Sequence, residues 1–132
     1  MIDIHAHFLW AVDDGPESME VTIRLLQQAV NEGITEMIAT SHSFHPQYHV
    51  DYETIHKQIA ILQSQLMRHQ IPLTLHTGHE VRLSDNIIPL YKAKQIHTLA
   101  NSNYILLELP SHTVPYYSIN IIRELLTEGL VP

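Results

Sequence analysis

The chain has 132 residues, a length that suits one domain, and a formal net charge of −7. This acidity argues against a protein that binds the phosphate backbone of nucleic acids. There is no cysteine, which excludes disulfides and thiolate metal sites. No apolar stretch is long enough for a transmembrane helix and no secretory signal is visible, so we expect a cytoplasmic protein without membrane insertion.

Strands and helices are predicted to alternate along the chain. In chain order we expect a strand at residues 2–7, a helix at 18–32, a strand at 36–40, a helix at 51–69, a strand at 72–77, a short helix at 84–94, a strand at 103–108 and a helix at 115–128. The helix predictions rest on apolar residues three or four positions apart, such as Met19, Ile23, Leu26 and Val30. Gly33 and Gly129, which follow the first and last helices, are typical of helix ends.

This alternation predicts an α/β fold with a parallel sheet and right-handed crossovers. It fits either an open, doubly wound sheet or the first four to five units of a β/α barrel. Leu130 and Val131 indicate the start of a fifth strand, and a sheet edge left uncovered favours pairing with another chain. We therefore expect residues 1–132 to form a single, incomplete domain, a fragment that self-associates.

Histidine is the unusual feature of the composition, since eleven histidines outnumber the seven Lys and Arg residues together. Ligands bind at the carboxyl edge of parallel sheets and barrels. The predicted strands bring to that edge a set of imidazoles and carboxylates: His5, His7, Asp13, Asp14, His42, Glu80 and Glu108. His5 and His7 share one face of a strand, because side chains alternate with a period of two. Nitrogen and oxygen ligands without sulfur suit Mn, Fe or Zn.

Each of these residues also has an ordinary structural explanation. The Asp-Asp-Gly-Pro sequence suits a turn whose aspartates cap the next helix, His42 suits a buried core position, and Glu108 suits an exposed strand end. Arg82 suits phosphate binding through its guanidinium fork and equally suits a salt bridge to a nearby acid. Only the combination, with every strand end contributing, favours a metal centre.

The remaining histidines are weaker candidates. His79 would point away from Glu80 on the same strand, and His112 is a lesser candidate for the rim of the site. The loop histidines His45 and His49 are expected to be solvated or to line a substrate cleft. His76, just before Thr77 and Gly78, suits a buried position, and a surface position is expected for three others: His56, His69 and His97.

Five motifs in fixed order, DIHAH, DDGP, ATSH, TGHEVR and LLELP, together resemble one family. They are similar to the N-terminal half of the PHP (polymerase and histidinol phosphatase) superfamily. More narrowly, they resemble the bacterial PHP-type tyrosine-protein phosphatases of capsular and exopolysaccharide synthesis. Two positions depart from the usual pattern without removing a ligand: Leu9-Trp10-Ala11 replaces Leu-Pro-Gly, and Ser41 stands where proline is commoner.

The resemblance implies a distorted, TIM-barrel-like β/α barrel that holds up to three divalent ions, with manganese expected and iron, zinc or magnesium as alternatives. Carried over by position, His5, His7 and Glu80 resemble ligands of one ion. Glu80 and Glu108 resemble ligands of a second, and Asp14 and His42 resemble ligands of the third. The remaining ligands of the family follow its fifth strand and lie near its C-terminal end.

The activity that the resemblance implies is hydrolysis of phosphotyrosine on the C-terminal tail of the tyrosine kinase that regulates polysaccharide synthesis. A metal-bound hydroxide would attack phosphorus in line, with the metals and Arg82 stabilising charge on the phosphoryl oxygens. Cysteine-phosphatase chemistry is excluded because no cysteine is present. Two alternatives stay open: an inactive fragment that binds only metal or a partner, and a phosphoesterase for a small ester such as histidinol phosphate.

Overall fold

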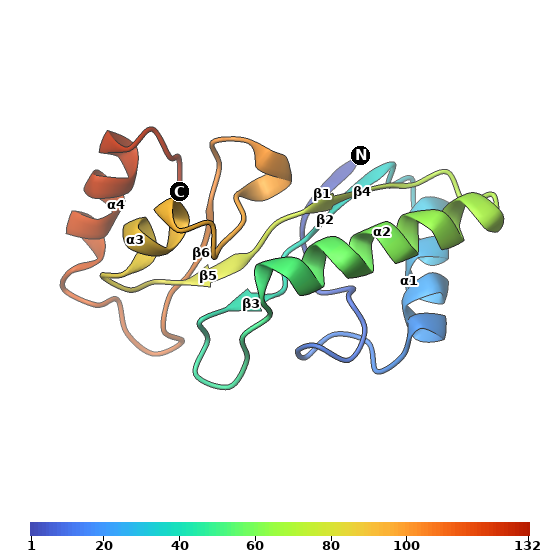
Figure 1. The fold of residues 1–132 in the computed structure, drawn as a ribbon, viewed down its shortest axis with the longest axis horizontal. Coiled ribbons are helices and arrows are strands. Elements are labelled where there is room, and N and C mark those ends of the chain that lie inside the picture. The colour runs from blue at the N-terminus through green and yellow to red at the C-terminus, as the bar shows by residue number, and fades with distance from the viewer.

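A computed structural model describes all residues, 1–132, as a mixed α/β protein with parallel sheets (Figure 1). The elements in chain order are β1 (Ile2–Ala6), α1 (Met19–Asn31), β2 (Glu36–Ala39), β3 (His42–Ser43), α2 (Tyr52–Arg68), β4 (Thr74–Thr77), β5 (Glu80–Arg82), α3 (Ile87–Lys92), the 3₁₀ helix η1 (Leu99–Asn101), β6 (Leu106–Glu108) and α4 (Ser118–Thr127). The predicted alternation is confirmed, and element ends differ from the predicted ones by at most three residues. None of the helices combines the length and apolarity that a membrane crossing requires.

The predicted parallel sheet is divided into two, with strand orders β1-β2-β4 and β3-β5-β6. The division arises because two predicted strands are each interrupted and then continue, β2 into β3 and β4 into β5. Gly78 lies in the second interruption, where a Cβ atom would sit 2.7 Å from Cγ2 of Ile38. The absence of a side chain at Gly78 therefore lets the chain pass close to β2 as it moves from one sheet to the other.

Each sheet has its own hydrophobic core. The first core joins the β1-β2-β4 sheet to α1 and α2, through residues such as Leu26, Met37, Leu62 and Leu75. The second joins the β3-β5-β6 sheet to α3 and α4, through residues such as Val81, Ile87, Ile121 and Leu125. Figure 1 shows the corresponding arrangement, with α1 and α2 at one end of the molecule and α3 and α4 at the other.

Local capping explains where the main helices begin and end. Ser18 accepts a hydrogen bond from the Val21 N–H at the start of α1, and Asp51 accepts one of 2.8 Å from the Thr54 N–H at the start of α2. Gly33, just beyond α1, has a φ angle of +89°, which glycine adopts without steric cost. The end of α1 predicted from Gly33 is therefore confirmed.

The predicted surface position of His97 is wrong, because this residue is only 2% exposed. The segment that leads into η1 packs against the start of α2, and the His97 ring stacks on the Tyr52 ring with centroids 3.5 Å apart. The His97 backbone N–H donates to Nδ1 of His79, whose Nε2–H donates to the Val50 carbonyl. Burial lowers the pKa of His97 to about 4 and that of His79 to about 3. Both rings are therefore neutral at physiological pH.

The neutral state of His97 predicts a pH-dependent stability. Between about pH 6.5 and pH 4 the unfolded chain binds a proton at His97 and the folded chain does not, so the free energy of unfolding falls as pH is lowered. His97→Phe keeps a ring for stacking on Tyr52, and it should reduce this slope by up to ~1.4 kcal/mol per pH unit. Urea unfolding of both proteins at several pH values, with a chelator present, measures the slope.

The control for this measurement is His69→Phe, at the exposed end of α2. Equal slopes for His97→Phe and the unsubstituted chain would contradict the burial of a neutral His97.

Candidate metal centre

Strand β1 brings His5 and His7 to the same carboxylate. Nε2 of His5 lies 3.4 Å, and Nε2 of His7 lies 3.0 Å, from Oε2 of Glu80. Strand β1 contains a β-bulge between Asp3 and Ala6, where it has one residue more than the paired stretch of β2. Thr40 holds the end of this bulge, because its Oγ1 accepts a 2.9 Å hydrogen bond from the Ala6 N–H. His7 follows the last residue of β1, and both imidazoles nevertheless reach the same carboxylate of Glu80.

The loop after β1 folds back over His7. Oδ1 of Asp14 lies 2.7 Å from Nδ1 of His7, and Oδ2 of Asp13 accepts a hydrogen bond from the backbone N–H of His42. A Cβ atom at Gly15 would lie 2.8 Å from the carbonyl oxygen of His7. Glycine at this position thus permits the tight return that places Asp14 beside the imidazole.

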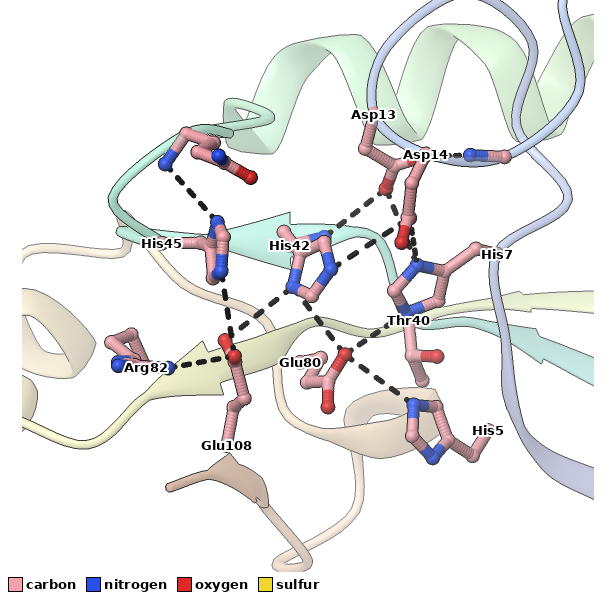
Figure 2. Close-up of polar contacts among 12 residues, drawn as sticks. His5, His7, Asp13, Asp14, Thr40, His42, His45, Glu80, Arg82 and Glu108 are labelled. Atoms are coloured by element: carbon pink, nitrogen blue, oxygen red, sulfur yellow. Dashed lines mark hydrogen bonds and ion pairs between the residues drawn. The ribbon is translucent and has the colours of Figure 1, made fainter. Parts of the chain in front are cut away.

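His42 lies at the middle of the cluster, as Figure 2 shows. Strands β3 and β5 pair in parallel with His42 opposite Glu80. Nδ1 of His42 lies 3.4 Å from Oε2 of Glu80 and 3.5 Å from Oε2 of Glu108, and its Nε2 lies 3.7 Å from Oδ1 of Asp14. The structure therefore brings together all six residues that the sequence singled out as metal ligands: His5, His7, Asp14, His42, Glu80 and Glu108.

Arg82 lies opposite Glu108 in the pairing of β5 with β6. Its Nη1 donates to Oε1 of Glu108 at 2.7 Å and to the carbonyl of Leu109 at 3.4 Å. The salt bridge, one of the two roles considered for Arg82, is thus present. Both hydrogen bonds come from Nη1, so the remaining N–H groups of the guanidinium keep the phosphate role open.

His45, for which the sequence left open a solvated position or the lining of a substrate cleft, lies in the cluster. Its Nε2 lies 3.6 Å from Oε1 of Glu108, and its ring stacks on that of His42 with centroids 4.6 Å apart (Figure 2). The only signal in the sequence is its place three residues after His42. His79 lies outside the cluster and bonds to Val50, and His112 is exposed.

Two groups of side chains have the geometry to hold an ion. They are His5 with His7 and Glu80, and His7 with Asp14 and His42; in each group the candidate ligand atoms lie within 4.8 Å of one another. Glu108 belongs to neither group. Imidazole nitrogen with carboxylate oxygen suits manganese, iron or zinc.

The charge of the cluster also fits bound cations. Four carboxylates, those of Asp13, Asp14, Glu80 and Glu108, surround the histidines, and Arg82 is the one permanent cation beside them. Two buried atoms in the cluster, Nδ1 of His42 and Oε2 of Glu108, have no hydrogen-bond partner. Unpaired buried polar atoms are costly, and a divalent ion would satisfy both kinds of atom.

Protonation of His7 compensates part of this negative charge. Burial by itself lowers the pKa of His7, but hydrogen bonds with Glu80 and Asp14 and the nearby charge of Asp13 outweigh it and raise the pKa to about 9. Burial raises the pKa of Glu80, whereas the hydrogen bond with His7 and the nearby imidazoles lower it more, so Glu80 stays ionised. A metal ligand must be a neutral imidazole, so an ion bound at His7 takes the place of this proton.

The fold and the cluster define a class: a parallel α/β protein with a histidine–carboxylate centre suited to divalent metals. Within that class, the chain belongs to the CpsB/CapC family of capsular polysaccharide synthesis, whose family model matches residues 1–132.

Curated relatives agree with this family. CapC of Staphylococcus aureus is 39% identical over 132 residues, and the tyrosine-protein phosphatase YwqE of Bacillus subtilis is 32% identical over 132 residues. Each match covers 100% of this chain and 52% of the relative, so the chain spans about half the length of the curated relatives it matches.

The fold of the chain also matches a solved structure of this family. It comes from a crystallographic description of YwqE from Bacillus subtilis and CpsB from Streptococcus pneumoniae as "unique metal-dependent tyrosine phosphatases". The TM-score is 0.95 at 32% sequence identity, and the match covers 100% of this chain and 53% of the other.

His7 belongs to both candidate ion groups, so its removal should affect both. We expect His7→Ala to weaken manganese binding at least about tenfold, since loss of a ligand costs no less than loss of a supporting contact. Calorimetric titration with Mn²⁺ measures the affinity and the number of ions bound.

His69→Ala, which removes an exposed imidazole outside the cluster, is the control and should bind manganese normally. An unchanged affinity in His7→Ala, with circular dichroism showing a folded variant, would argue against this centre as the metal site.

Proposed function

We propose that this chain carries part of the catalytic centre of a metal-dependent tyrosine-protein phosphatase of capsular polysaccharide synthesis, acting in the cytoplasm. The observation that carries the proposal is the convergence of three imidazoles on one oxygen, Oε2 of Glu80, which lies 3.4 Å from His5, 3.0 Å from His7 and 3.4 Å from His42. The chain that carries this convergence matches the family over residues 1–132. The relatives YwqE and CpsB are both named tyrosine-protein phosphatases, and they supply the reaction of this proposal.

The proposed ligand sets are those of the cluster. His5, His7 and Glu80 hold one ion, Asp14 and His42 hold another, and Glu80 and Glu108 contribute to a third. Manganese is the expected metal, with iron, zinc or magnesium as alternatives. Bound ions supply activation of water near neutral pH and neutralisation of charge on phosphoryl oxygens.

The chain's own side chains have three further tasks. Glu80 orients His5 and His7 through contacts of 3.4 and 3.0 Å to their Nε2 atoms. Asp13 holds the backbone of His42 through its N–H. Arg82 keeps Glu108 in place through Nη1, and its other N–H groups donate to the phosphoryl group of the substrate.

We further propose that residues 1–132 form the first four to five β/α units of a distorted barrel, as one incomplete domain. In both sheets the strands lie side by side in the order in which they occur along the chain. A β/α barrel has this order, whereas a doubly wound sheet reverses its strand order at one point. The sheet face away from α1 and α2 is apolar, with Ile2, Ile4 and Tyr104 exposed by 54%, 56% and 55% around a hollow of about 400 Å³. Inward side chains fill a barrel's interior, so this face is also where we expect self-association of the chain.

The proposed substrate is phosphotyrosine on the C-terminal tail of the tyrosine kinase that regulates polysaccharide synthesis. Hydrolysis of p-nitrophenyl phosphate with manganese tests the reaction class, and a phosphotyrosyl peptide compared with histidinol phosphate tests the substrate.

We expect His5→Ala/His7→Ala to reduce the rate by at least about a hundredfold, because it removes ligands from both ion groups.

Metal should be counted in the same samples, with His69→Ala as the control that keeps its rate. Bound manganese without hydrolysis would instead favour a fragment that binds metal only. Faster turnover of histidinol phosphate than of the peptide would favour the small-ester phosphatase.

A further inference from the structure

The loop between β3 and α2 places two aromatic rings at the edge of the metal centre. The ring of Tyr48 is nearly parallel to that of His42, at 10° with centroids 5.7 Å apart, and to that of His45, at 20° with centroids 5.6 Å apart. Tyr48 and His45 are both partly exposed, whereas His42 is buried. The two outer rings therefore form an aromatic wall over the innermost imidazole.

Backbone hydrogen bonds fix this wall in place. The Gln47 N–H donates to Nδ1 of His45, and the Val50 N–H donates to the carbonyl of His42. Because Nδ1 of His45 accepts a hydrogen bond, the neutral ring carries its proton on Nε2, which faces Glu108 at 3.6 Å (Figure 2). The loop thus presents an ordered surface with a defined donor toward the centre.

We propose that Tyr48, together with His45, forms the aryl subsite of this centre, the surface that receives the aromatic ring of the phosphomonoester. This inference rests on the proposed function and specifies its substrate class. In an aryl phosphate a single oxygen joins the ring to phosphorus, so the ring must lie directly beside the phosphoryl group. Tyr48 and His45 are the aromatic side chains stacked at that edge, and offset stacking on them favours an aryl ester over an alkyl ester.

A purely structural role for Tyr48 predicts a different outcome. If Tyr48 only supported His42, its loss would weaken aryl and alkyl ligands equally, since both use the same phosphoryl site. The ratio of the two affinities therefore separates recognition of the ring from support of the centre.

The experiment measures affinities of the manganese-loaded chain for benzylphosphonate and methylphosphonate by calorimetry. Both ligands have a carbon–phosphorus bond that is not hydrolysed, and only the first has a ring. In Tyr48→Ala we expect benzylphosphonate to bind roughly three- to tenfold more weakly, with methylphosphonate changed by less than about twofold. Tyr48→Phe should retain the preference for benzylphosphonate.

The matched control is Tyr116→Ala, which removes a tyrosine that is 96% exposed ahead of α4 and packs edge to face against Tyr117. Equal weakening of both ligands in Tyr48→Ala, an unchanged ratio, or no binding of benzylphosphonate to the unsubstituted chain would each overturn the inference. Assays of p-nitrophenyl phosphate hydrolysis on the same samples keep the two proposals apart. If Tyr48→Ala changes the ratio of the two affinities but the unsubstituted chain does not hydrolyse p-nitrophenyl phosphate, the aryl subsite is supported and the phosphatase proposal is not. If hydrolysis occurs and the ratio is unchanged, the phosphatase proposal is supported and the aryl subsite is not.

Discussion

The carboxylate of Glu80 is the point on which the rest of the site depends. Its Oε2 atom lies 3.4 Å from Nε2 of His5, 3.0 Å from Nε2 of His7 and 3.4 Å from Nδ1 of His42. A buried carboxylate needs positive or hydrogen-bonding partners, and here His5 in β1, His7 just after β1 and His42 in β3 provide them. The bulge in β1, the close passage at Gly78 and the β3–β5 register all contribute to this convergence.

Much of the fold followed from the sequence because local signals and tertiary packing agree. The long helices α1 and α2 have apolar residues at helical spacing and side-chain caps at Ser18 and Asp51. The division into two sheets was not predictable in this way. Strands β3 and β5 are two and three residues long, too short for a hydrophobic period, and their separation from β2 and β4 depends on a contact between Gly78 and Ile38.

The site shows the same contrast. Convergence of His5, His7 and Glu80 could be inferred, because strand periodicity and the carboxyl edge of a parallel sheet fix where such side chains meet. The place of His45 depends on the path of a loop held by a backbone N–H, which no spacing rule encodes. His97 was wrongly expected at the surface for a similar reason, since its burial comes from a connecting segment that packs against α2.

The two hydrophobic cores give the metal centre a role in the behaviour of the whole molecule. His5, His7 and Asp14 belong to the part built on β1, β2 and β4, whereas His42, Glu80 and Glu108 belong to the part built on β3, β5 and β6. An ion held by His5, His7 and Glu80 is therefore a cross-link between two folding units, and its binding energy is gained only when both are folded side by side. An ion bound there would therefore couple the stability of one part to that of the other.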